Sequence, residues 1–258
     1  HEALAATAEA GTDASHAIMT TDTKPKTVEL TGSNGWKIGG MVKGSGMIAP
    51  QLATMLCVIT TDAVVSAGQM QAALAVAAEH SFNRIDVDGC MSTNDTVILL
   101  ASGASEIVPD LDDFTEALTG VCASLARQLL ADAEGSSHDI AVTIMNAATE
   151  EDALDVARAV ARSNLFKTAI FGNDPNWGRV LAAIGTTQAS FDPYAVDVSF
   201  NGVRLCSAGA PDRPRDEVDL TPRPTLVVID LKAGDAEATI LTNDLTPDAV
   251  QENRAYSS

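Results

Sequence analysis

The stretch KGSGMIAPQLATML, from Lys43 to Leu56, holds residue types that can do chemistry without a histidine. Its glycines allow unusual φ values and close backbone approach, and Pro50 fixes one backbone dihedral. Such a frame suits a strained peptide bond between Ala53 and Thr54, with the threonine hydroxyl near the preceding carbonyl. The simpler alternative is a hydrogen-bonded core threonine, which is the usual role of a threonine in an apolar run.

The same stretch also meets part of a dinucleotide-binding pattern. Gly44, Gly46 and Ala49 satisfy G-x-G-x-x-A, and Asp62 follows the next apolar run. A dinucleotide fold needs a helix of several turns between these elements, yet the short intervening segment contains a proline. The P-loop order fails as well, because Lys43 precedes the first glycine. We therefore expect no nucleotide site.

The composition fits a globular protein with a substantial core. The chain has 258 residues, of which 46% are hydrophobic and 20% charged, and a formal net charge of -19. Such an acidic surface repels phosphate backbones and anionic lipids, so no nucleic-acid or membrane partner is expected. The longest apolar runs, MLCVI and VILLA, are far shorter than the ~20 residues of a membrane-spanning helix. The first residues carry no secretory signal.

The cysteines and histidines do not suggest a metal site. The four cysteines are widely spaced without a C-x-x-C pair, at Cys57, Cys90, Cys122 and Cys206. In a chain of this size they indicate reduced, buried thiols and a cytoplasmic protein. The four histidines lack ligand spacing. The acidic stretch DVDGCMSTNDT lacks the alternating oxygen ligands and closing glutamate of an EF-hand, so turn and cap roles are favoured there.

The apolar patterns predict a mixed α and β protein. Helices are expected over 1–10, 66–80, 111–133, 149–162 and 174–185, with Ser66 and Thr149 suited to open two of them. Strands are expected over 36–42, 55–60, 84–89, 139–147, 195–206, 225–231 and 236–242. Residues 92–103 fit a helix or a strand. This order favours an α+β or layered αββα architecture over a regular βαβ succession.

Several segments occur in one order and together cover nearly the whole chain. They are AIMTTDT at 17–23, KGSGMIAPQLATML at 43–56, DVDGCMSTNDT at 86–96, DAEG at 132–135, FGNDPNWGRVLAAIG at 171–185 and the terminal ENRAYSS. Together they resemble the ornithine acetyltransferase family of arginine biosynthesis, whose members are also called glutamate N-acetyltransferases. The resemblance implies a layered αββα-like fold that processes itself to free an N-terminal nucleophile.

In that family the precursor cleaves itself, which here implies cleavage between Ala53 and Thr54. Residues 1–53 would then be the C-terminal part of the family's α segment, with its upstream region missing. Residues 54–258 would be the β segment, intertwined with the first. The freed α-amine of Thr54 has an ordinary pKa of about 7.7–8.0, so it can take the proton from the hydroxyl of the same residue.

The resemblance also implies the reaction. The acetyl group of N2-acetyl-L-ornithine passes to Thr54 and then to L-glutamate, in a ping-pong mechanism without a cofactor. Bifunctional members also take the acetyl group from acetyl-CoA as a co-substrate, which these motifs leave open. The implied assembly is a heterotetramer of two α and two β fragments. Two other functions stay open: an N-terminal-threonine amidohydrolase or aminopeptidase, and a non-catalytic binding subunit in which the threonine is inert.

The family's substrate contacts map onto matching residues of this sequence. They are Thr20, Lys43, Thr54, Glu134, Asn253 and Ser258. The resemblance implies that Lys43 neutralises a substrate carboxylate and that Glu134 receives the cationic ornithine side chain. Simpler roles compete with each assignment: a turn cap for Thr20, a solvated Lys43, the end of a surface helix for Glu134, and a frayed tail for the last two residues.

One part of the family pattern does not match. The family's oxyanion hole uses a Thr-Gly pair well before the AIMTTDT segment. The nearest candidates here, Gly11 and Thr12, stand in the reverse order. Loss of an oxyanion donor typically costs ~10²–10³ in turnover. We therefore expect these 258 residues to need a further region for full catalysis.

Overall fold

The chain folds into two compact units, each built on one sheet. The computed structural model describes residues 7–46, 55–90 and 93–255. The first unit comprises His1–Ile85 with Gly89–Ala133, and the second comprises Asp86–Asp88 with Glu134–Ser258. The predicted mixed α and β class is confirmed. The predicted segment boundary between residues 53 and 54 lies outside the described residues and stays a prediction.

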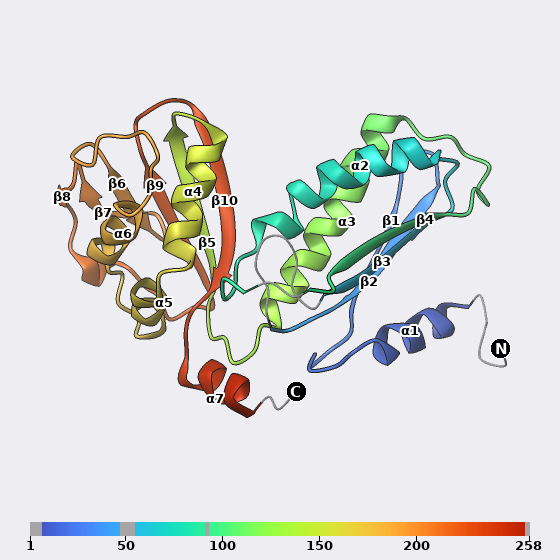
Figure 1. Ribbon diagram of the computed structural model, residues 1–258, viewed down its shortest axis with the longest axis horizontal. Coiled ribbons are helices and arrows are strands. Elements are labelled where there is room, and N and C mark those ends of the chain that lie inside the picture. The colour runs from blue at the N-terminus through green and yellow to red at the C-terminus, as the bar shows by residue number, and fades with distance from the viewer. Residues whose placement is uncertain (1–6, 47–54, 91–92, 256–258) are drawn as a thin grey trace. The chain divides into compact units, whose positions relative to one another are not determined.

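The first unit contains a four-stranded sheet in the order β1-β2-β3-β4 (Figure 1). Strands β1 and β2, and β2 and β3, are antiparallel, whereas β3 and β4 run parallel. The elements of this unit are α1 (Ala8–Ala17), β1 (Lys26–Thr31), β2 (Lys37–Lys43), β3 (Leu56–Thr61), α2 (Ala67–Glu79), β4 (Thr96–Ala101) and α3 (Leu111–Ala131).

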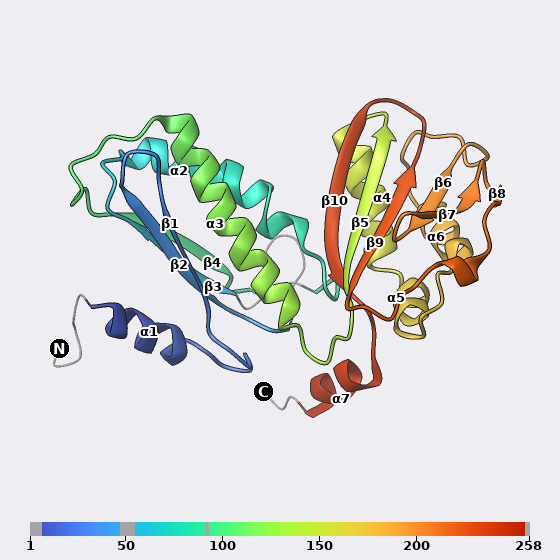
Figure 2. The ribbon, with the colours of Figure 1, turned by 180° about the vertical axis from the view of Figure 1, so that it is seen from behind.

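The core of the first unit lies between this sheet and helices α2 and α3, which lie together along one face (Figure 2). The predicted apolar stripe of α3 is buried, at Phe114, Leu118, Val121, Leu125 and Leu129. The helix approaches the sheet closely at a strand glycine, since a Cβ on Gly40 would lie 3.1 Å from Leu125 Cδ1. A side chain at position 40 would therefore crowd the face of α3 that packs on the sheet.

The second unit contains a six-stranded sheet in the order β10-β5-β9-β6-β7-β8 (Figure 2). Strands β5 and β9 are parallel and the other pairs are antiparallel. Helix α4 packs on β5 and β10, and α6 contacts α4 and β6. The elements are β5 (Asp139–Ala147), α4 (Glu150–Ala161), α5 (Asn164–Phe171), α6 (Trp177–Ile184), β6 (Asp197–Phe200), β7 (Val203–Ser207), β8 (Ala210–Pro211), β9 (Pro224–Asp230), β10 (Ala236–Asn243) and α7 (Pro247–Ala255).

The two predicted helix caps are confirmed. The Ser66 side chain accepts a hydrogen bond from the amide of Gln69, and the Thr149 side chain accepts one from the amide of Asp152. Both hydroxyls thus satisfy amides of the first helical turn, which have no carbonyl partner within the helix.

Several local predictions are wrong. Helix α1 does not end at Gly11 but continues to Ala17, and a Cβ on that glycine would meet nothing within 4 Å. Strand β1 and helix α5 were not predicted. The strand predicted over 84–89 does not form, because Phe82–Arg84 is a 3-10 turn and bends follow it. The ambiguous segment 92–103 contains strand β4.

The cysteines follow the prediction with one exception. Cys57, Cys122 and Cys206 are buried free thiols, but Cys90 is exposed. Burial raises the pKa of the Cys122 thiol to about 12, so this thiol stays protonated at neutral pH. Within the described ranges, no helix is both long and apolar enough to cross a membrane.

Candidate functional site

One edge of the first sheet collects the ends of three strands. The register pairs Lys43 with Leu56 and Leu56 with Thr96. The last residue of β2 therefore lies beside the first residue of β3, which in turn lies beside the first residue of β4. The loop between β2 and β3 contains the predicted cleavage junction. That junction, with Ala53 and the predicted nucleophile Thr54, lies outside the described residues.

The backbone just after this junction is held on two sides. The amide of Met55 donates a hydrogen bond to Oδ1 of Asp95 at 2.8 Å, and its carbonyl accepts one from the amide of Thr96 at 3.0 Å. The Met55 residue is also buried. The chain directly after the junction is therefore fixed at the edge of the sheet.

The structure brings two predicted substrate contacts together at the same edge. The Nζ atom of Lys43 lies 3.5 Å from Oγ1 of Thr20, a long hydrogen bond. Lys43 is only 5% exposed, which contradicts the simpler interpretation of a solvated surface lysine. Thr20 is exposed. A largely buried ammonium beside an accessible hydroxyl can bind a carboxylate through charge-assisted hydrogen bonds.

Asp22 fixes the backbone on both sides of this pair. Its Oδ2 accepts a hydrogen bond from the amide of Thr20 at 3.1 Å, and its Oδ1 accepts one from the amide of Gly44 at 2.6 Å. Gly44 has a φ of +147°, a value that glycine adopts most readily. Burial raises the pKa of Asp22, but hydrogen bonds from Gly44, Lys26 and Thr20 outweigh burial and leave this pKa below its ordinary value.

The other predicted contacts belong to the second unit. Glu134 is half-buried and directly precedes Gly135. Asn253 lies in α7, and Ser258 lies outside the described residues. Thr20 and Lys43 are thus placed together within one unit, whereas Glu134 and Asn253 belong to the other.

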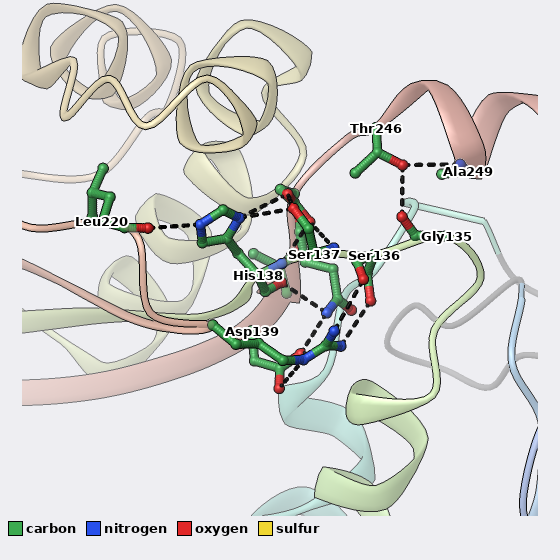
Figure 3. A network of polar contacts seen from close by, with 12 residues as sticks. Gly135, Ser136, Ser137, His138, Asp139, Leu220, Thr246 and Ala249 are labelled. Carbon is green, nitrogen blue, oxygen red and sulfur yellow. Dashed lines mark hydrogen bonds and ion pairs between the residues drawn. The ribbon is translucent and has the colours of Figure 1, made fainter.

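Within the second unit, the segment that follows Glu134 packs on the first turn of α7 (Figure 3). Thr246 Oγ1 donates a hydrogen bond to the carbonyl of Gly135 at 2.6 Å and accepts one from the amide of Ala249 at 3.0 Å. Gly135 has a φ of +66°, and a Cβ there would lie 2.3 Å from the amide nitrogen of Ala249. The contact therefore requires glycine at this position.

A serine, a histidine and an aspartate meet next to this contact, but not as a catalytic triad (Figure 3). His138 Nδ1 lies 2.9 Å from Asp244 Oδ2 and 3.0 Å from Ser137 Oγ. His138 Nε2 faces the carbonyl of Leu220 at 2.8 Å. A triad needs the serine and the aspartate on opposite ring nitrogens. The arrangement is therefore structural.

Asp244 joins the start of β5 to the end of β10. Its Oδ1 accepts hydrogen bonds from the amides of Ser137 and His138, both at 2.9 Å. Burial raises the pKa of Asp244, but hydrogen bonds from Ser137 and His138 outweigh it, so this pKa is below its ordinary value. Arg223 adds a bidentate contact to Asp139 at 2.9 and 3.0 Å. The segment after Glu134 is therefore held tightly.

Comparison with known proteins identifies the family of this chain. The model described as the ArgJ family matches residues 1–258. This chain belongs to the ArgJ family. The resemblance found in the sequence is thereby confirmed.

Relatives in this family are similar along nearly the whole chain. The arginine biosynthesis bifunctional protein ArgJ of Bifidobacterium longum is 70% identical over 262 residues, covering 100% of this chain and 67% of that protein. The protein of the same name from Streptomyces coelicolor is 55% identical over 96% of this chain and 64% of its own length. The chain thus spans about two thirds of the length of these relatives.

A crystal structure in the ArgJ family has the same fold. The arginine biosynthesis bifunctional protein argJ of Bacillus halodurans superposes with a TM-score of 0.71 at 34% identity. The match covers 76% of this chain and 97% of that one.

Sequence reasoning missed several residues around the ArgJ family contacts. Asp22 holds the backbone amides of Thr20 and Gly44. Asp244 holds the amides of Ser137 and His138, and the ring of His138 in turn contacts the Asp244 carboxylate. Of Asp22, His138 and Asp244, only Asp22 lies inside a quoted motif, AIMTTDT. Within the described ranges, no group of three or more His, Cys, Asp or Glu side chains is arranged to hold a metal ion. A groove at the opposite edge of the first sheet, lined in part by Lys37, Asp62 and Ser102, contains none of the predicted contacts.

Proposed function

We propose that this ArgJ family protein transfers the acetyl group of N2-acetyl-L-ornithine to L-glutamate through an acetyl-Thr54 intermediate. The chain first cleaves itself between Ala53 and Thr54. The observation that carries the proposal is the shared sheet edge, where the buried Lys43 ammonium lies one strand away from the backbone that follows Thr54. The match of the entire chain to the ArgJ family supports the same assignment.

Cleavage begins when Thr54 Oγ attacks the carbonyl carbon of Ala53. An ester bond forms, the peptide C–N bond breaks, and the nitrogen takes the proton of the hydroxyl and becomes a free α-amine. Water then hydrolyses the ester, leaving a carboxylate on Ala53 and a free hydroxyl on Thr54. Met55, fixed through Asp95, anchors the chain on the C-terminal side of the reacting bond.

Acetyl transfer uses the same hydroxyl. The neutral α-amine, with an ordinary pKa of about 7.7–8.0, takes the hydroxyl proton while Oγ attacks the acetyl carbonyl of N2-acetylornithine. The amide C–N bond breaks, and ornithine leaves with the proton. The amine of glutamate then attacks the acetyl ester, which gives N-acetylglutamate and restores the Thr54 hydroxyl.

The substrate contacts divide by charge. Lys43, with Thr20 beside it, binds the substrate carboxylate. Glu134 receives the cationic side chain of ornithine, and Asn253 and Ser258 are the remaining substrate contacts. The reaction needs no cofactor, and acetyl-CoA would enter as a second acetyl donor. Such a second activity fits the word bifunctional in the names of the relatives.

The sheet supports the association of the two fragments. Cleavage would place β2 in the first fragment and β3 in the second, yet β3 pairs with β2 on one side and β4 on the other. The length of the Bacillus halodurans chain is consistent with such fragments. The match covers 76% of this chain but 97% of that one, so the solved chain is shorter than this chain by about a fifth. Residues 1–53 make up about the same share of this sequence. We assign a cytoplasmic tetramer of two α and two β fragments.

Labelled acetyl transfer tests this function. The complete natural chain, given acetyl-labelled N2-acetylornithine and L-glutamate, should form labelled N-acetylglutamate much faster than free acetate. Release of acetate alone would instead support the amidohydrolase alternative. A chain that stays uncut, and whose Thr54→Ala variant behaves like the wild type, would support the non-catalytic alternative.

A further inference from the structure

We propose that Asp22 is a positioning residue for the substrate-contact pair Thr20 and Lys43, and that Lys26 and Asp132 hold the Asp22 carboxylate in one orientation. The inference rests on the proposed role of that pair in binding substrate. It assigns a function to three buried charged residues that are not themselves proposed to touch substrate.

The three charges form a closed cluster inside the first unit. Lys26 Nζ lies 2.5 Å from Asp22 Oδ1 and 2.5 Å from Asp132 Oδ2. The side chains of Lys26 and Asp22 are fully buried and that of Asp132 is 3% exposed. On the far side, Thr23 donates to Asp132 through its amide at 3.0 Å and through its hydroxyl.

The cluster reaches the pair of Thr20 and Lys43 through the backbone that Asp22 holds. Asp22 accepts the amides of Thr20 and Gly44. The first belongs to one proposed substrate contact, and the second follows the other, Lys43. Two segments that are separated in sequence are thus joined at one carboxylate group, and their side chains meet at 3.5 Å.

Stability alone gives a weak reason for this cluster. Removing a charged pair from water costs several kcal/mol per ion, and apolar replacements of buried ion pairs are often neutral or stabilising. A fixed carboxylate, however, determines geometry as well as energy. Because each oxygen of Asp22 already accepts a backbone amide, rotation of this carboxylate would break both contacts.

The consequence for substrate binding is large relative to the movement involved. A misplacement of about 1 Å in a binding group can cost about 10²-fold in rate. An asparagine at position 22 keeps the size of the side chain but presents an NH₂ group where an oxygen now accepts an amide or the Lys26 ammonium. Thr20 and Lys43 would then lose their shared support while their own side chains stay intact.

The test compares three variants of the complete natural chain. Asp22→Asn acts on the proposed support directly, Asp132→Asn removes one of the two carboxylates on Lys26, and Thr23→Val is the matched control. Thr23 contacts Asp132 and not the Asp22 carboxylate, and its amide contact remains in the valine variant. For each variant, intact mass gives the extent of cleavage, and kinetics give KM for N2-acetylornithine and kcat.

The expected order separates positioning from general stability. Asp22→Asn should raise KM about tenfold or more with a smaller change in kcat, as loss of ground-state binding does. Asp132→Asn should give a smaller rise, and Thr23→Val should leave KM within about twofold of the wild type. A folded, cleaved Asp22→Asn protein with unchanged KM overturns the inference. So does an equal change in Asp22→Asn and Thr23→Val.

Two further measurements keep the inference separate from the proposed function. If Asp22→Asn does not fold, an unchanged KM in Asp132→Asn overturns the inference. If the wild type does not transfer acetyl groups, the proposed function fails, and calorimetric binding of L-glutamate still decides the role of Asp22. Weaker binding in Asp22→Asn than in Thr23→Val would support it, and equal binding would contradict it.

Discussion

The backbone amide of Met55 donates a 2.8 Å hydrogen bond to a carboxylate oxygen of Asp95, directly after the proposed cleavage junction. This contact joins the start of β3 to the residue before β4. It fixes the backbone next to the reacting bond, and its effect on the rate of self-cleavage can be measured.

Replacing Asp95 with alanine should slow self-cleavage by about tenfold or more, because the residue after the junction loses its anchor. A time course of fragment formation by intact mass measures this. Asp62→Ala is the matched control, because Asp62 Oδ1 accepts the amide of Lys37 at 2.7 Å at the opposite edge of the same sheet. Equal cleavage rates in the two variants would contradict the anchoring role.

Replacing Lys43 with methionine should weaken binding of both amino-acid substrates. Loss of a charge-assisted contact of about 1.5–3 kcal/mol corresponds to roughly 10–100-fold in KM. Lys37→Met is the control, because Lys37 stands at the other end of β2 with a side chain 61% exposed. Steady-state kinetics give KM for each variant, and only Lys43→Met should show the rise. A normal KM in folded Lys43→Met would exclude this lysine as the carboxylate contact.

Replacing Gly135 with alanine should disturb the contact between the Glu134 segment and α7. The new Cβ would lie 2.3 Å from the Ala249 amide, and the φ of +66° adds strain of about 1–2 kcal/mol. Gly202→Ala separates the two effects, because its φ is +84° and a Cβ there meets nothing within 4 Å. Only Gly135→Ala should also raise KM for N2-acetylornithine. Matching KM values in the two variants would argue against a role for this contact in binding.

Lys167 gives a pH-dependent prediction in the second unit. The residue is buried, and its ammonium donates hydrogen bonds to the carbonyl of Val87 and, at 3.0 Å, to Thr242 Oγ1. Desolvation lowers the pKa of Lys167 to about 8, against the opposing effect of nearby carboxylates. These carboxylates belong to Asp86, Asp88 and Asp244.

The sign of the pH effect follows from proton binding. Between about pH 8 and pH 10.4 the unfolded chain holds the Lys167 proton more tightly than the folded chain. Stability therefore rises with pH in this window. In Lys167→Met this contribution is absent. From pH 8 to pH 10 the unfolding free energy of the wild type should therefore rise relative to that of the variant. Urea unfolding at both pH values measures it, and a constant difference would contradict the prediction.

The elements that the sequence predicted well carry their own local signals. The stripe of α3 repeats with helical period from Phe114 to Leu129, and the helix that begins after Thr149 has a cap and an acidic first turn. Strand β1 has no such signal, because four of its six residues are exposed and it pairs with β2 through its backbone. At 84–89, tertiary contacts replace the predicted strand, since the Asp86 carboxylate pairs with Arg162 at 2.5 Å.

In the candidate site too, contacts between residues far apart in the sequence could not be predicted. Thr20 and Lys43 were predicted from the family resemblance, and the structure places them in contact. The support beneath them was not predicted, because Lys26 and Asp132 are joined across 106 positions of the sequence. The DAEG motif drew attention to Glu134, whereas its first residue completes a buried cluster in the first unit. Only folding brings such partners together.

Mass analysis of the acetylated enzyme tests the central claim most directly. The complete natural chain is incubated with N2-acetylornithine, with the released ornithine removed and no glutamate present, and its peptides are then mapped. We predict a fragment that begins at Thr54 and carries one hydroxylamine-sensitive acetyl ester on that residue, which disappears when glutamate is added. An unbroken backbone at Ala53–Thr54 in protein that transfers acetyl groups at full rate would contradict the account.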